Sequence, residues 1–115
     1  MENMISLGSG YKERFVVPGT TPTLRFRFKT IPLDQLVRAY LTIQQDEENI
    51  IEKSIEDAEM EENYLSFTLT QQETLKIKAD GCLLIQLRFK TLGGYAGASP
   101  AYLEKGYRIL KGGEI

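Results

Sequence analysis

Histidine and tryptophan are absent from this sequence of 115 residues. Without an imidazole, the chain cannot form a Ser-His-Asp or Cys-His nucleophile, a histidine acid–base catalyst or a histidine zinc site. It also has no glycine-rich phosphate loop of the type G-x-x-x-x-G-K or G-x-G-x-x-G. We therefore expect a protein that is not an enzyme and that holds no cofactor.

Cysteine occurs once, as Cys82, so no intrachain disulfide can form. A chain of this kind is typical of a reducing compartment at synthesis. No apolar run approaches the roughly eighteen residues of a membrane span, and residues 1–6 lack the basic start and apolar run of a secretory signal. With 42% hydrophobic and 26% charged residues, the chain has the composition of a globular protein. We expect residues 1–115 to form a single domain, with residues 1–10 flexible.

Short runs of alternating apolar and polar residues are the main signal in the sequence. In residues 23–29, Leu24, Phe26 and Phe28 fall on one face and the three cations between and after them fall on the other. A strand sorts these residues onto two faces, whereas a helix would scatter them around its axis. This segment is therefore predicted to be a half-buried strand.

The same alternation recurs along the chain and predicts an antiparallel sandwich of about seven strands separated by turns. Residues 45–49 are predicted to form a hairpin loop between two of these strands. Strong strands are expected at 37–44 (with Val37, Ala39, Leu41 and Ile43 on one face), 64–70 and 83–90, and weaker ones at 12–17, 49–55 and between 98 and 110. The predicted core contains Phe26, Phe28, Leu41, Ile43, Leu65, Phe67, Leu69, Ile85, Leu87 and Phe89.

One short helix is predicted after residue 70. Thr70 and Glu73 have the spacing of a capping box, in which each side chain accepts a hydrogen bond from the other residue's backbone N–H. The helix would continue for about a turn, and Leu75 and Ile77 would close the end of the sandwich.

Charge is distributed unevenly. Residues 46–62 contain nine acidic side chains and one lysine, a net charge of −8, so the rest of the chain carries +6. The positive excess concentrates on the outward faces of two predicted strands. We take these cations as a candidate protein interface: Arg25, Arg27, Lys29, Arg88 and Lys90.

Other interpretations of these charges are weaker. Calcium loops need alternating oxygen ligands and a glycine, and residues 46–62 have no glycine, so no metal site is expected. The aromatics beside Arg25 and Arg27 are predicted to be buried, which opposes single-stranded nucleic-acid binding by stacking. A carboxylate pair would suffice for glycoside hydrolysis, but Asp34, Asp80 and the acidic segment give no sign of a shared cleft.

Two interpretations of the charge separation remain open. The basic strands and the acidic segment could mediate contact between copies or docking on a charged partner. Alternatively, they could meet within one molecule as surface salt bridges of little energetic consequence.

Four segments, taken in order, carry a family resemblance. They are residues 18–23 (PGTTPT), 69–75 (LTQQETL), 85–91 (IQLRFKT) and 109–115 (ILKGGEI). From about residue 15 to 115, the chain resembles small proteins of the tail and baseplate modules of phages and prophages of Gram-positive bacteria. It also resembles the N-terminal immunoglobulin-like domain of phage baseplate upper proteins.

The resemblance implies an all-β, immunoglobulin-like sandwich with a structural or assembly role in a virion tail, baseplate or neck. The expected partners are other phage structural proteins or a second copy of the chain, with no nucleic acid and no membrane involved. The protein would be made in the host bacterial cytoplasm and then incorporated into the virion. The alternative is a carbohydrate- or surface-binding adhesion module on the same fold.

Overall fold

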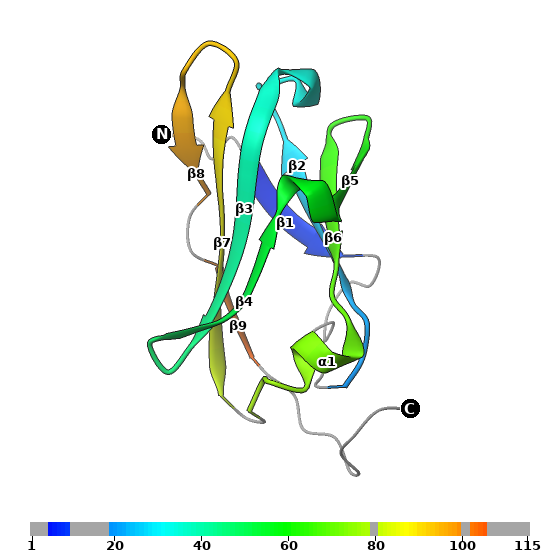
Figure 1. Cartoon of the computed structure of the whole chain (residues 1–115), viewed down its shortest axis with the longest axis vertical. Helices are drawn as coiled ribbons and strands as arrows, with labels where there is room; N and C mark the ends of the chain where they lie inside the picture. The colour runs from blue at the N-terminus through cyan, green and yellow to red at the C-terminus, as the bar shows by residue number, and fades with distance from the viewer. Residues whose placement is uncertain (1–4, 10–18, 79–80, 100–101, 106–115) are drawn as a thin grey trace.

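The structure is a computed structural model that describes residues 5–9, 19–78, 81–99 and 102–105. It consists of two antiparallel sheets (Figure 1). Sheet A has the strand order β1-β2-β6-β5, and sheet B has the order β4-β3-β7, with β8 and β9 both paired to the other edge of β7. This order matches the ABED and C′CFG sheets of an immunoglobulin-like sandwich, and the all-β prediction is confirmed. The strands are β1 (Ile5–Ser9), β2 (Thr23–Phe28), β3 (Leu36–Gln45), β4 (Glu48–Ser54), β5 (Ala58–Glu61), β6 (Tyr64–Thr68), β7 (Cys82–Thr91), β8 (Ala96–Ala98) and β9 (Tyr102–Lys105).

The predicted helix is present as α1 (Gln71–Thr74), between β6 and β7. Its capping box has the predicted geometry: the Glu73 N–H donates to Thr70 Oγ1 over 3.1 Å, and the Thr70 N–H donates to Glu73 Oε1 over 2.9 Å. Two short 3₁₀ helices, η1 (Leu33–Gln35) and η2 (Ile55–Asp57), connect strands of the two sheets. All three helices are single turns, so they serve as connections between strands.

The core lies between the inward faces of the two sheets, and every residue predicted to be in it is buried. Phe28 of sheet A and Phe89 of sheet B meet edge to face, with ring centroids 5.4 Å apart. Phe26 and Phe67 make a similar contact within sheet A at 6.0 Å. Edge-to-face pairs of this kind are favourable beyond the area that they bury, so the Phe28–Phe89 pair stabilises the contact between the two sheets.

One predicted inward position is wrong. The alternation predicts that Val37 shares the buried face with Ala39, but its side chain is 40% exposed and Leu36 is buried instead. The pairing of β3 with β7 shifts register between Leu36 and Arg38. A bulge of this kind inserts one residue and interrupts the alternation, and a period-two pattern alone cannot locate it.

An N-terminal strand adds to those that the alternation predicts. Ile5–Ser9 pairs along β2 as strand β1, from Ile5 opposite Phe28 to Ser9 opposite Leu24. The flexibility expected of residues 1–10 stays a prediction. The pairing satisfies backbone groups that would otherwise leave β2 at a sheet edge. Residues 1–4 and 10, the predicted strand at 12–17 and residues 106–110 lie outside the described residues.

Ser99 joins the two short strands that share the edge of β7. The Leu87 N–H donates to Ser99 Oγ over 3.0 Å, and the Ser99 N–H donates to the Leu87 carbonyl over 2.8 Å. The Gln86 amide adds a bond to the Ser99 carbonyl at 3.0 Å. Thus the buried backbone of β7 keeps its partners where β8 has ended and β9 has not begun.

The β3–β4 hairpin generates a prediction about stability. Asp46 and Glu47 have φ angles of 53° and 67°, the left-handed region that a two-residue turn needs and that glycine adopts at no steric cost. Glu47→Gly should increase the free energy of unfolding by about 0.5–1 kcal/mol, measured by urea denaturation. Glu47→Gln, which removes the same charge and keeps the Cβ, is the control. Equal effects of the two substitutions would contradict a backbone origin.

Candidate functional site

The five predicted interface cations do not share one surface. Arg25 and Arg27 lie on the outer face of β2 in sheet A, and Lys29 lies in the bend that follows this strand. Arg88 and Lys90 lie on the outer face of β7, in sheet B. The two sheets pack with their inner faces together, so the fold places the two groups on opposite sides of the sandwich.

The sheet A group is partly occupied by a contact of its own. The Arg25 guanidinium lies 4.1 Å from the centroid of the Tyr64 ring, on the neighbouring strand β6. A cation–π contact at this distance orients the arginine along the sheet surface. Arg27 lies opposite Tyr64 in the strand register, so one tyrosine separates these arginines from the acidic strand β5.

The sheet B group gains a residue that the sequence analysis missed. In the register of β3 with β7, Arg38 lies directly opposite Lys90, and Tyr40 lies opposite Arg88. The Arg88 guanidinium is 5.7 Å from the centroid of the Tyr40 ring. All four side chains are exposed. Period-two alternation points Arg38 outward, but only the pairing of two distant strands brings it to Lys90.

These four residues border a shallow hollow of about 490 Å³, which also borders Phe89 and the small residues of β8. We call Arg38, Tyr40, Arg88 and Lys90 the basic hollow. The residues of β8 are alanine and glycine, so no long side chain from that strand fills the hollow. The size falls within the range of ligand-binding clefts, but the hollow opens broadly on the sheet surface.

The remainder of the same sheet face is polar. Two further hollows, of about 330 and 280 Å³, adjoin Arg88 and Glu52. Glu52 lies on the edge strand β4, opposite Thr42 of β3. The outer face of sheet B therefore changes from basic beside β8 to weakly acidic beside β4.

The acidic segment runs through two edge strands, β4 of sheet B and β5 of sheet A, and through η2, which connects them. Four exposed glutamates stand at its far end and form what we call the acidic ridge: Glu56 of η2, Glu59 and Glu61 of β5, and Glu62 of the turn that follows. Short, charged edge strands discourage uncontrolled pairing with other chains. Glu59 and Glu61 suit this role, because β5 is an edge strand of sheet A.

Ion pairs do not neutralise these surfaces within the described part of the chain. There, salt bridges join Lys53 to Glu73 at 2.9 Å and Lys78 to Asp46 at 3.7 Å. The second pair is largely exposed, and such pairs contribute little stability. Neither pair involves a cation of the candidate interface or a glutamate of the acidic ridge.

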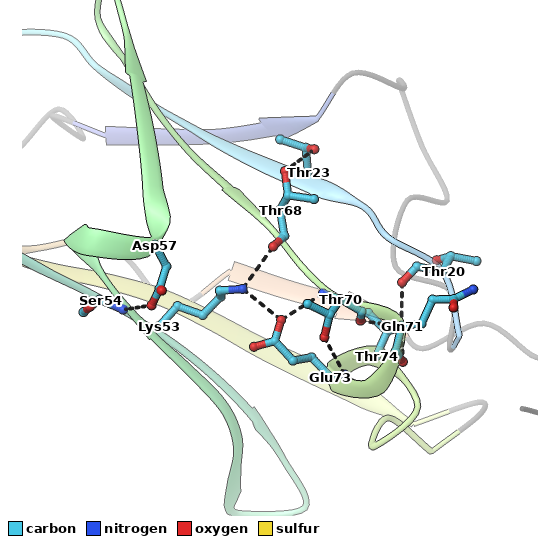
Figure 2. A network of polar contacts seen from close by, with 10 residues as sticks. All are labelled: Thr20, Thr23, Lys53, Ser54, Asp57, Thr68, Thr70, Gln71, Glu73 and Thr74. Carbon is cyan, nitrogen blue, oxygen red and sulfur yellow. Dashed lines mark hydrogen bonds and ion pairs between the residues drawn. The ribbon is translucent and has the colours of Figure 1, made fainter. Parts of the chain in front are cut away.

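A polar network ties the two sheets together at the α1 end of the sandwich, as Figure 2 shows. Lys53 extends from β4 of sheet B and donates to Glu73 Oε1 at 2.9 Å and to the Thr68 carbonyl at 3.0 Å. Thr74 Oγ1 donates to the Thr20 carbonyl at 2.7 Å. The Lys53 side chain is only 11% exposed, so it fixes strands and offers no accessible catalytic amine.

The charge state of Glu73 reflects these contacts. Burial by itself would raise the pKa of this carboxyl group, but the Thr70 N–H and the Lys53 ammonium stabilise the carboxylate and lower its pKa below the ordinary value of 4.5. A carboxylate held ionised in this way is a structural anion. It is the opposite of a general acid, whose pKa must be raised.

Metal and membrane interpretations find no support in the described residues. That part of the chain contains no group of three or more cysteine, aspartate or glutamate side chains arranged to hold a metal ion. Its helices are also too short to cross a membrane. Cys82 is free and exposed at the start of β7.

The Glu73 contacts predict a pH-dependent stability. Because the folded-state pKa is lowered, the contribution of Glu73 is complete above its unfolded-state pKa and is lost as pH falls through the folded-state value. At pH 7, Glu73→Gln should lower the free energy of unfolding by about 1–2 kcal/mol. The difference from the unsubstituted protein should shrink below pH 4.5. Chemical denaturation between pH 7 and pH 3 measures both values.

The matched control for this prediction is Glu56→Gln, an exposed glutamate of η2. It changes the net charge equally and should alter stability by less than about 0.5 kcal/mol. A constant difference between Glu73→Gln and the unsubstituted protein across the pH range would contradict the assigned ion pair.

Comparison of this chain with family models, with curated proteins and with solved structures gives no match. A fold alone does not determine a function. The features that bear on function are therefore the charge and geometry of the two outer sheet faces and the resemblance carried by the sequence segments.

Proposed function

We propose that this chain is a non-enzymatic structural protein of a phage or prophage virion that acts through protein–protein contacts. Its place would be the tail, the baseplate or the neck. The order of the four sequence segments supports the virion assignment, and the immunoglobulin-like sandwich is compatible with it. The protein would be synthesised in the host bacterial cytoplasm and assembled with other structural proteins.

One observation carries the proposal for protein contact. Cations lie on the outer faces of both sheets, and none of these cations is ion-paired among the described residues. Charged surfaces that are not neutralised internally attract and orient partners of opposite charge. They also leave the free domain with unfavourable repulsion between neighbouring like charges. An acidic surface on a partner would relieve that repulsion.

Nucleic acid is a poorer partner for these faces. Proteins that bind single strands need exposed rings for base stacking beside their cations. Phe26 and Phe28, which alternate with Arg25 and Arg27, are almost completely buried. On the same face, Tyr64 already has the Arg25 guanidinium next to its ring.

A carbohydrate- or surface-binding adhesion module is the second candidate. The observation that favours it is the basic hollow, where the 42% exposed Tyr40 ring borders an open floor of small residues. Sugar binding would use this ring as an apolar platform and would depend little on salt. Protein contact through the arginines would weaken as salt is added, because exposed charges are screened.

The proposal is tested by mixing the purified chain with the purified products of the neighbouring structural genes. Light scattering at 50 mM and 500 mM salt should show a complex that is weakened by salt. Two matched variants, Arg25→Glu with Arg27→Glu and Arg88→Glu with Lys90→Glu, each change the net charge by −4. At least one should weaken the complex tenfold or more.

Two outcomes would contradict the proposal. One is a chain that remains monomeric with every structural protein at both salt concentrations. The other is binding to a glycan array that is insensitive to salt and is abolished by Tyr40→Ala, which would favour the adhesion module. Thermal unfolding of each variant establishes that its domain remains folded.

A further inference from the structure

We propose that the basic hollow of one copy binds the acidic ridge of a second copy, head to tail. This inference rests on the proposed function and names both the partner and the contact surfaces. It places the contact on the sheet B cations alone and leaves Arg25, Arg27 and Lys29 outside it.

The fold contains an unfavourable pairing of like charges. Arg38 and Lys90 lie directly opposite each other on β3 and β7, with Arg88 two residues along the same strand face. Like charges in directly opposed positions destabilise a sheet. No acidic side chain among the described residues pairs with any of the three. Residues that reduce the stability of a fold are expected mainly at functional sites, so this cluster of like charges is a candidate binding surface.

The acidic ridge carries the opposite charge. Its four glutamates are exposed and lack ion-pair partners within the described ranges. The sheet A cations Arg25 and Arg27 lie beyond β6, opposite Ser66 and Tyr64 in register. They are therefore two strand spacings, about 10 Å, from the backbone of β5. The nearby lysine of β4, Lys53, is already committed to Glu73.

The spacing of the charges also matches. Glu59 and Glu61 are two residues apart on one side of β5, and Arg88 and Lys90 are two residues apart on one side of β7. Alternate residues of a strand repeat every 6.5–7 Å or so. Two carboxylates can therefore face two cations simultaneously, and arginine can bind a carboxylate through two parallel hydrogen bonds.

Tyr40 supplies an anchor beside these charges. Its ring is partly exposed at the border of the basic hollow and lies near the Arg88 guanidinium. Tyrosine and arginine are the residue types that contribute most often to the energetic centre of protein interfaces. The hollow therefore offers the contact both an aromatic surface and a positive charge.

The positions of the two surfaces determine the type of assembly. Figure 1 shows β8, which borders the basic hollow, at one side of the sandwich and β5, which carries much of the acidic ridge, at the other. One molecule therefore cannot bring its own ridge into its own hollow. A contact between two different patches leaves one free hollow and one free ridge at the ends, so copies can add until a ring closes or a filament grows.

The experiment uses complementary charge reversals measured by light scattering at 50 mM salt. The hollow variant is Arg38→Glu with Lys90→Glu, and the ridge variant is Glu59→Lys with Glu61→Lys. The unsubstituted chain should self-associate and should dissociate at 500 mM salt. Each variant alone should remain monomeric. Their mixture should associate, because the intact ridge of the hollow variant can bind the intact hollow of the ridge variant, and the two reversed surfaces also carry opposite charges.

A single substitution separates the interface role from a structural one. Arg38→Glu places opposite charges across from each other on β3 and β7, so it should raise the midpoint of thermal unfolding. The same substitution should weaken self-association tenfold or more. The matched control is Arg25→Glu with Arg27→Glu, which has the same charge change as the hollow variant and should retain self-association.

Two results would overturn this inference. One is an unsubstituted chain that is monomeric at 50 mM salt; binding to another structural protein would then leave the proposed function standing without the self-contact. The other concerns a chain that does self-associate. The inference fails if the hollow variant and the ridge variant each self-associate as strongly as the unsubstituted chain, or if a mixture of the two variants does not associate.

Discussion

The register between β3 and β7 is the constraint on which the rest of the structure depends. These are the two longest strands described, each of ten residues, and they lie side by side in the middle of sheet B. Ala39, Leu41 and Ile43 face Phe89, Leu87 and Ile85 across this pairing, and all six are buried. A slip of one residue would move every one of these side chains to the opposite face. The same register fixes the outer row of charges, so core and surface are specified together.

Polar contacts close the sandwich where the strands end. Gln45, at the end of β3, is 4% exposed; its amide donates to the Lys78 carbonyl at 3.0 Å and accepts from the Lys78 N–H at 2.8 Å. A Cβ at position 81 would overlap this amide, so a larger residue there would displace Gln45 from its bonds to Lys78. The Lys53–Glu73 pair completes the same end from the sheet edge. Buried polar groups of this kind stabilise a fold only when their partners are present.

The charged side chains divide into two classes with different consequences. Lys53 and Glu73 are largely buried and hydrogen-bonded, so they belong to the scaffold. Arg38, Arg88 and Lys90 are exposed and lack carboxylate partners among the described residues, so they are available to a partner. The affinity of a partner for an exposed charged surface of the second class depends strongly on salt, because the binding is made of many weak contacts. That behaviour suits a component that is added to an assembly more than it suits a catalyst.

The sequence by itself determined the strongly alternating strands β2, β3, β6 and β7, the core and the helix cap, whereas it gave no signal for β1 and β5. Leu24, Phe26 and Phe28 alternate with cations, and an alternating pattern has one stable solution when one face must be buried. The Thr70 capping box could also be predicted, because its contacts span only three residues. The tertiary structure alone decided which charged side chains share a surface. The five predicted cations separated onto opposite faces, and Arg38 joined Lys90 from more than fifty residues away. Neighbours across a sheet depend on register and on bulges such as that at Val37, and these depend on packing between distant segments that local periodicity does not encode.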